Sequence, residues 1–236
     1  MSHITDSQRR ELLLRVEKPG RYTGGEFGSI CKEGILRVAL SYPDLYEIGM
    51  SNNAVRILYR LLNTIPGVSC ERVFAPARDL EAELASRRLP LFSLESGQPL
   101  FTFDIVAFSM GYELNASCLL QILAAGEVPL HAADRDDRHP LVIGGGPGLI
   151  NPAPWRAFFD GIYLGEAEQW IGTVFPDLVR LKQQGARRDA LADRLFSAPA
   201  LSSASRPFAR RAVWMGFGRE TEDERAGSAF PVASLT

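Results

Sequence analysis

Short apolar runs alternate with helical segments along the middle of the chain, and this alternation constrains the fold more than any other feature. Continuous apolar runs bounded by turns are typical of strands buried on both faces of a parallel sheet. Such strands, alternating with helices, pair in parallel through right-handed crossovers. The sequence therefore predicts an α/β, doubly wound, three-layer fold with a five-stranded, mainly parallel sheet. We expect strands at 36–41, 68–75, 104–110, 141–146 and 160–165, and helices at 54–65, 78–88, 115–125 and 167–181.

The first of these helices carries the clearest pattern. Its apolar residues recur every three or four positions, which indicates an amphipathic helix with one apolar face. Ser51 or Asn52 is the expected N-cap. Two further features are less regular: residues 128–132 are a candidate extra strand, and Pro176 should kink or divide the last helix. The apolar stripe consists of Ala54, Ile57, Leu58, Leu61, Leu62 and Ile65.

The chain divides into three parts. Residues 1–34 form a polar N-terminal extension with a short helix expected at 7–16, and residues 35–182 form the sheet domain. Residues 183–236 begin with a short helix at 186–196 and continue as a tail rich in Ser, Ala, Arg and Pro. Low hydrophobic periodicity of that kind predicts disorder or a truncated end.

Composition excludes several classes of protein. The 236 residues are 46% hydrophobic and 23% charged, with a net charge of −2, so no electrostatic signal indicates a nucleic-acid partner. No run approaches the ~20 apolar residues of a membrane span, and no signal peptide is present, so we expect a cytoplasmic protein without a membrane partner. The cysteines and histidines are too widely spaced for a disulfide framework or a metal site. They are Cys31, Cys70, Cys118, His3, His131 and His139.

Three glycine-bearing turns follow strands and therefore meet at one edge of the predicted sheet. They are 44–49, 109–111 and 144–146. In open α/β sheets, ligands bind outside the carboxyl ends of the strands. Glycine lets a backbone approach a ligand closely, although it also serves simple tight turns between strand and helix. None of the turns matches the dinucleotide fingerprint or the P-loop, and this disfavours nicotinamide binding and nucleoside triphosphate hydrolysis.

The chain resembles the N-terminal cobalamin-binding-like domain of cobalamin-type radical SAM proteins, in an uncharacterised group with a further C-terminal fused domain. The resemblance covers residues 20 to about 182. It is carried by Arg21-Tyr-Thr-Gly-Gly-Glu26, Tyr42-Pro-Asp-Leu-Tyr-Glu-Ile-Gly-Met-Ser51, Glu71-Arg-Val-Phe-Ala-Pro76, Pro90-Leu-Phe-Ser-Leu-Glu-Ser96, Phe103-Asp-Ile-Val-Ala-Phe-Ser109, Gly111-Tyr-Glu-Leu114, Leu141-Val-Ile-Gly-Gly-Gly-Pro147 and Gly165-Glu-Ala-Glu168.

The resemblance implies a set of cofactor-binding residues. Cobalamin domains carry D-x-H-x-x-G after the first strand, S-x-L after the third and G-G after the fourth. Ser109 and the glycines would line the tunnel for the nucleotide tail of the cofactor. This chain has Tyr in place of the histidine and Gly in place of the leucine. The positions concerned are Asp44, Tyr46, Gly49, Ser109, Gly111, Gly144, Gly145 and Gly146.

Tyr46 replaces the histidine at the position of the lower cobalt ligand, and this changes which protein group could coordinate the metal. A neutral imidazole coordinates cobalt, whereas a phenol with a pKa near ~10 does so poorly at neutral pH. Cobalamin would then bind without a protein nitrogen, as in radical SAM methylases of this type. Alternatively, Tyr46 is an aromatic wedge under the first helix, and Asp44 bonds to backbone amides of its own turn.

The radical SAM core itself is missing from the sequence. Its C-x-x-x-C-x-x-C motif, which holds a 4Fe-4S cluster and leaves one iron open for S-adenosylmethionine, does not occur. We therefore expect no catalysis by this chain alone, and a core domain in the same or a neighbouring polypeptide as its partner. A truncated or split gene product would explain the tail. The acidic turn 165–168 would lie near that core by resemblance, or its carboxylates simply favour a helix N-terminus.

Three functions remain open. The first is a cobalamin-binding module of a radical SAM protein, in which Gly144→Val is expected to abolish cofactor retention by filling the path of the tail. The second is a degenerate scaffold that binds no cofactor and docks on a radical SAM core. The third, with a suitable fold but without the fingerprint, is a flavin or nicotinamide nucleotide binder.

Overall fold

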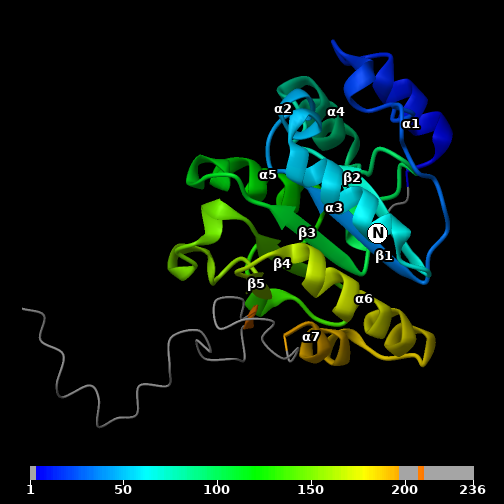
Figure 1. Ribbon diagram of the computed structural model, residues 1–236. Coiled ribbons are helices and arrows are strands. Elements are labelled where there is room, and N and C mark those ends of the chain that lie inside the picture. Colours follow the sequence, from blue (N-terminus) through cyan, green and yellow to red (C-terminus); the bar gives the residue numbers. More distant parts are fainter. Residues whose placement is uncertain (1–3, 197–206, 210–236) are drawn as a thin grey trace, which may run out of the picture.

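The computed structural model describes residues 4–196 and 207–209, and it confirms the predicted α/β fold (Figure 1). Five parallel strands lie in the order β2-β1-β3-β4-β5, and β6 adds an antiparallel edge strand beside β5. Because all five point the same way, their carboxyl ends share one edge of the sheet. The strands are β1 (Leu36–Ser41), β2 (Val68–Val73), β3 (Ile105–Ser109), β4 (Leu141–Gly145), β5 (Gly161–Tyr163) and β6 (Pro207–Ala209).

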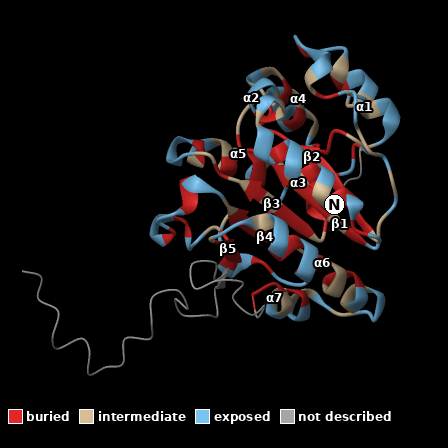
Figure 2. Ribbon diagram, in the orientation of Figure 1, coloured by how far each residue is buried: buried red, intermediate tan, exposed pale blue. Residues whose placement is uncertain are grey.

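Helices cover both faces of the sheet. One core cluster packs α3 (Asn53–Thr64), α6 (Ala167–Gln183) and α7 (Arg188–Phe196) on one face. A second cluster packs α1 (Asp6–Leu13), α4 (Arg78–Arg87) and α5 (Ala116–Ala125) on the other. The buried residues in Figure 2 accordingly run along the strands, and the outer sides of the helices are exposed. The short helix α2 (Tyr46–Ser51) lies between β1 and α3.

Helix α3 forms where its pattern predicts. The side chain of Asn52 accepts a hydrogen bond from the backbone N–H of Val55 at 3.3 Å, which confirms one of the two expected N-caps. Val55, Tyr59 and Leu62 are buried against the sheet. Ile57 is 51% exposed, although it lies within the expected apolar stripe. That stripe is therefore wider than the core beneath it, and its outer part remains open to a ligand or partner.

The structure differs from what the sequence predicts at two places. Residues 128–132 form no strand: the guanidinium of Arg135 donates to the carbonyls of Pro129 and Leu130, at 2.9 and 2.8 Å, in place of a neighbouring strand. Pro176 does not divide α6, which is continuous over 17 residues. The turn after the first strand also holds an unexpected helix, α2.

The N-terminal segment, residues 4–34, packs closely on the sheet domain. Leu12, Val16 and Tyr22 belong to the core cluster that includes α4 and α5. Arg72, on the edge strand β2, donates to the side chains of Glu26 and Ser29, both at 2.8 Å. The outer backbone groups of β2 are bonded by the Asn63 side chain and by Leu94 and Glu95, so this edge is not left open for pairing with another strand.

The C-terminal part is described only in part. The expected helix at 186–196 is observed as α7, and β6 follows in the sheet. The prediction of a disordered or truncated tail falls mainly on residues 197–206 and 210–236, which lie outside the described residues. Within the described ranges, no helix combines the length and apolar character that a membrane crossing requires.

Candidate functional site

A pocket of about 730 Å³ opens at the carboxyl edge of the sheet, on the face covered by α3 and α6. This volume lies within the range of about 300–1,000 Å³ that is typical of small-molecule sites. Its base is formed by the ends of β1, β3, β4 and β5, and its sides by the two helices. The pocket thus lies where ligands of open α/β sheets are expected.

Small residues form the base of the pocket. Ser109 follows Phe108 at the end of β3, Gly144 and Gly145 end β4, and Gly146 follows that strand. Successive residues of a strand face opposite sides of the sheet, so Gly145 shares the pocket side with Ile143. A Cβ at Gly145 would meet only the carbonyl oxygen of Tyr163, at 3.4 Å. The space above this glycine is therefore open to a ligand.

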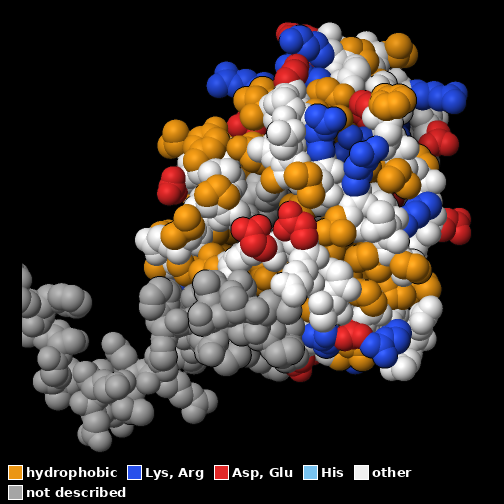
Figure 3. All heavy atoms as spheres, viewed as in Figure 1, with side chains coloured by type: hydrophobic (Ala, Val, Ile, Leu, Met, Phe, Trp, Pro, Cys, Tyr) orange, Lys and Arg blue, Asp and Glu red, His pale blue; other side chains and the backbone are white. Residues whose placement is uncertain are grey.

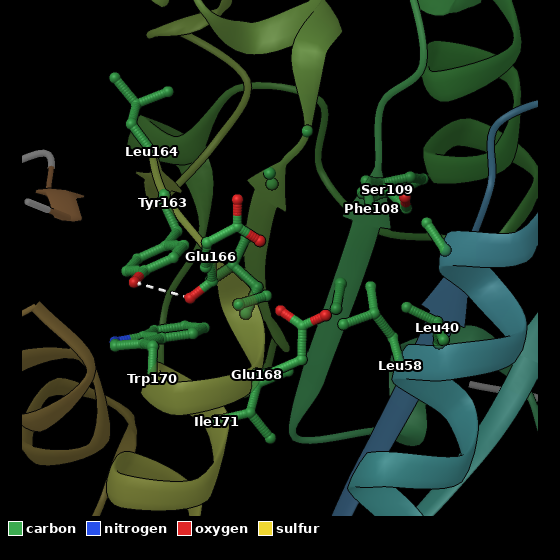
Figure 4. A pocket seen from close by; sticks show the side chains of 18 of the residues that line it. Leu40, Leu58, Phe108, Ser109, Tyr163, Leu164, Glu166, Glu168, Trp170 and Ile171 are labelled. Carbon is green, nitrogen blue, oxygen red and sulfur yellow. Dashed lines mark hydrogen bonds between the residues drawn. The ribbon is translucent and has the colours of Figure 1, made fainter. Parts of the chain in front are cut away.

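Aromatic and aliphatic side chains line the walls. The rings of Tyr163 and Trp170 stack with centroids 4.5 Å apart, and both line the pocket from the β5 and α6 side. Ile57, Leu58 and Leu62 of α3 form the opposite wall. Figure 4 shows Leu58 and Trp170 on opposite sides of the opening. Such walls suit a planar, apolar group.

Two carboxylates are the only charged groups among the described residues that line the pocket. Glu166 and Glu168 are exposed, and Figure 4 shows both carboxylates directed into the space between α6 and α3. The backbone carbonyl of Glu166 accepts a hydrogen bond from the Tyr163 hydroxyl at 3.2 Å, which fixes the turn. Figure 3 shows acidic side chains among apolar ones in the middle of this face. Within the described ranges, neither carboxylate forms a salt bridge.

Asp44 organises its own turn. Its Oδ1 accepts a hydrogen bond from the N–H of Leu45 at 2.8 Å, and its carbonyl accepts one from Ala75 at 2.9 Å. Its Oδ2 lies 3.5 Å from Nδ2 of Asn115. Asp44 does not line the pocket. The turn after β1 is therefore tied to β2 and α5 rather than directed at a ligand.

Tyr46 is directed toward the N-terminal segment. Its hydroxyl donates to Oε1 of Glu26 at 2.9 Å, and its ring meets the Phe74 ring edge-on at 5.8 Å. Burial, and then the bond to the Glu26 carboxylate, raise the pKa of Tyr46 to about 12. Tyr46 is not a lining residue. Its contacts match the interpretation of Tyr46 as an aromatic wedge.

Three of the predicted glycines are required by close packing. A Cβ at Gly49 would overlap the Phe74 ring, and one at Gly111 would overlap the Tyr42 hydroxyl. Gly146 has φ +107°, a conformation that glycine tolerates best, and its Cβ would lie 2.5 Å from the carbonyl of Met110. Of these three, only Gly146 lines the pocket.

Gly144 faces away from the pocket, although its backbone lines it. A Cβ there would lie 2.6 Å from Leu149 and 2.7 Å from Phe159, which belong to the core cluster on the opposite face of the sheet. Valine at this position would disrupt that core and would not fill the pocket. The physical reason expected for the Gly144→Val substitution is therefore wrong, and Gly145 is the residue that tests the pocket.

Comparison with known proteins places this fold in a family. A family model described as radical SAM proteins, N-terminal, matches residues 54–201, more than half of the chain. The chain belongs to this family. No curated protein and no solved structure matches it. Membership associates this radical SAM N-terminal domain with a radical SAM core, and thereby the family with S-adenosylmethionine and a 4Fe-4S cluster.

The radical SAM N-terminal domain brings together about half of the predicted site residues. Four line the pocket, whereas Asp44, Tyr46, Gly49 and Gly111 are not among its lining residues. Trp170, Tyr163 and the α3 wall were not predicted as site residues. The spacing of the apolar stripe could not reveal that Ile57 is exposed, because helical periodicity does not show where a neighbouring helix is absent. The four that line the pocket are Ser109, Gly144, Gly145 and Gly146.

No cluster site is visible in the described part of this domain. Its residues include no group of three or more His, Cys, Asp or Glu side chains placed to hold a metal ion. Cys31 is exposed, Cys70 is buried and Cys118 is half-buried, and none forms a disulfide. Burial raises the pKa of the Cys70 thiol well above its usual value, so this thiol remains protonated.

Proposed function

We propose that the chain is the corrinoid-binding module of a radical SAM protein, and that its pocket accepts the nucleotide tail of cobalamin. The glycine-walled pocket between α3 and α6 is the observation that carries this proposal. Neither Tyr46 nor Met110 lines the pocket, so these two bulky side chains do not occupy the space that the tail would need. When bound, a corrinoid supplies a cobalt centre next to the chemistry of the partner core.

The residues present fit the tail of a corrinoid. Ser109 and Gly145 leave space at the base of the pocket, and the stacked rings of Tyr163 and Trp170 offer a wall for a flat lower base. Aromatic pairs of this kind contribute about 0.5–1.5 kcal/mol beyond the area they bury. Ser109 also provides a hydroxyl that can donate to or accept from the tail.

Charge favours a corrinoid over a flavin or nicotinamide nucleotide. Among the described residues, no Lys or Arg lines the pocket, whereas Glu166 and Glu168 do. A phosphate monoester such as that of FMN carries a charge of about −1.5 to −2 at neutral pH and would meet like charge. In cobalamin, the phosphodiester belongs to the same molecule as a cationic Co(III) corrin, which offsets it.

The position of Tyr46 supports binding without a protein ligand to cobalt. Its hydroxyl is engaged by Glu26 and its pKa is raised, so the phenolate that could coordinate a metal does not form near neutral pH. Tyr46 would then supply no ligand to the cobalt. An absorbance spectrum of the base-off type is the expected signature.

The test is a titration of the purified chain with hydroxocobalamin, FMN and NAD, followed by absorbance and thermal unfolding. We expect hydroxocobalamin alone to bind, and Gly145→Val to weaken its binding by at least about ten-fold, because a loss of ~1.4 kcal/mol corresponds to that factor. The side chain would extend from an open position into the pocket.

A matched control separates the pocket from general stability. Apart from its chain neighbours and the backbone of its own helix, nothing lies within 4 Å of the position that a Cβ would take at Gly172 on α6, so Gly172→Val should leave binding unchanged. If the wild-type chain binds none of the three compounds, the corrinoid proposal fails. Equal effects of the two valine substitutions would also contradict a role for the pocket.

The second candidate function is a scaffold that docks on the radical SAM core without a cofactor. The observation that favours it is the structural use of the turn after β1. Asp44, Tyr46 and Gly49 all make packing or hydrogen-bond contacts within the domain. In this case the titration would show no binding, and the partner would still be the core to which the family is linked.

A further inference from the structure

The pocket combines an apolar interior with an acidic opening. Trp170 and Tyr163 are 5% exposed each, whereas Glu166 and Glu168 are exposed at the turn that leads into α6. The Glu168 carboxylate extends toward Leu58 of α3, and the Glu166 carboxylate lies beside it in the opening (Figure 4). A ligand that reaches the aromatic rings must therefore pass the carboxylates.

No cation among the described lining residues compensates this charge. Arg56 and Arg60 are exposed on α3, but neither lines the pocket. The two carboxylates also belong to the first turn of α6 and the residue before it, where the helix dipole favours negative charge. With no Lys or Arg among the described lining residues, these two carboxylates make the opening acidic.

We propose that Glu166 and Glu168 determine which ligand ends enter the pocket: they admit an uncharged nucleoside and exclude a nucleoside that ends in a phosphate monoester. This inference rests on the proposed function, because the nucleoside is taken to be the end of a corrinoid tail. Ribose hydroxyls can donate hydrogen bonds to the carboxylates, while an added phosphate monoester brings only like charge. The two glutamates are thus specificity-determining residues.

The experiment measures two probes by equilibrium dialysis against the full chain: α-ribazole, which is the nucleoside of the cobalamin tail, and α-ribazole 5′-phosphate. We expect the wild-type chain to bind the nucleoside at least about ten-fold more tightly than its phosphate, as close like charges predict. Raising the salt to about 1 M, where the Debye length is about 3 Å, should reduce this preference.

The double variant Glu166→Gln with Glu168→Gln removes the charge and keeps the size and the acceptor oxygens. Its affinity for the nucleoside should change by less than about two-fold, while its affinity for the phosphate should rise to within about three-fold of the nucleoside. The matched control is Glu33→Gln with Glu81→Gln. Both of these residues are exposed and lie outside the pocket. This control should retain the wild-type preference.

The outcomes separate this inference from the proposed function. Equal binding of the two probes by the wild-type chain, or an unchanged preference in the Gln variant, overturns the role of the glutamates. Binding of hydroxocobalamin without binding of either probe also overturns it, while the corrinoid function stands. Failure of hydroxocobalamin and both probes to bind overturns both proposals. Thermal unfolding of each variant verifies that it is folded.

Discussion

At the scale of single residues, Tyr46 shows how a motif position can serve structure. The sequence places it at the position of a cobalt ligand, whereas its hydroxyl contacts Glu26, which in turn contacts Arg72. The Arg72 guanidinium also donates to Glu95 at 2.7 Å. Burial acts to lower the pKa of Arg72, but Glu95 and Glu26 outweigh it and raise the pKa. Tyr46 therefore completes a partly buried network that holds the N-terminal segment.

Replacing Tyr46 with Phe tests this network. The variant should lose about 1.5–3 kcal/mol of unfolding free energy, since a hydrogen bond to a charged group contributes that much. The folded pKa is about 12, above the ordinary value near 10, so the folded state retains the proton more strongly. The Tyr46 contribution is therefore complete below pH ~10 and is lost as the pH rises toward 12.

The measurement is urea unfolding of the wild type and of Tyr46→Phe from neutral pH to about pH 12. The difference in unfolding free energy between the two proteins should decrease between about pH 10 and about pH 12. Tyr112→Phe serves as the control, because Tyr112 is exposed and its hydroxyl lies 3.4 Å from Asp44, a longer contact than that of Tyr46 with Glu26. A constant difference at every pH would contradict the assigned contact.

At the scale of elements, α6 shows how packing overrides a local signal. Pro176 lies inside a continuous helix whose residues Val174, Phe175 and Leu178 are buried against the sheet. Proline removes one hydrogen bond to the carbonyl four residues earlier, here that of Gly172, and crowds it. Burial of the apolar face stabilises the helix by more than this local cost.

Pro176→Ala should therefore stabilise the protein. Restoring the hydrogen bond from the N–H of residue 176 to the Gly172 carbonyl removes part of the ~3 kcal/mol cost of an interior proline. The substitution also makes the unfolded chain more flexible, and this lowers the free energy of unfolding by about 0.4–1 kcal/mol. We expect a net gain of about 1–2 kcal/mol in the free energy of unfolding. A lower unfolding midpoint in urea would show that the helix depends on the proline.

At the scale of the whole molecule, the N-terminal segment is part of the fold. Its Leu12, Val16 and Tyr22 are buried with α4 and α5, and Arg9 donates to the carbonyls of Tyr22 and Leu94, both at 2.9 Å. The sequence suggested a polar extension because few apolar residues are visible there. The apolar surface that these residues bury depends on contacts with distant parts of the chain, and periodicity does not reveal such contacts.

A chain that begins at Ile35 tests this contribution. Burying each of the three side chains contributes about 1.5–3 kcal/mol, so their loss is comparable to the 5–15 kcal/mol stability of a typical domain. We expect a partly unfolded, aggregating protein by circular dichroism and light scattering. A chain lacking only residues 1–3 is the control. If the chain that begins at Ile35 had the same unfolding temperature as the wild type, the assigned contribution of the N-terminal segment would be contradicted.

The strands could be predicted because their apolar runs are continuous. Leu36–Ser41 is observed as expected, and the strands Ile105–Ser109 and Leu141–Gly145 differ from prediction by one residue at their ends. The site was only partly predictable. Ser109 and Gly145 could be predicted because they lie at strand ends. Trp170 lines the pocket because of the distance between two helices. That distance depends on tertiary packing, which no local pattern records.

The position of β1 has a practical consequence for anyone designing an expression fragment. The family match begins at residue 54, after this strand, yet β1 lies between β2 and β3 in the sheet. A clone cut at the matched boundary would encode β2 without the neighbour that links it to the remaining strands. Such a recombinant piece would contain an interrupted sheet, so cloning should start well upstream of residue 54.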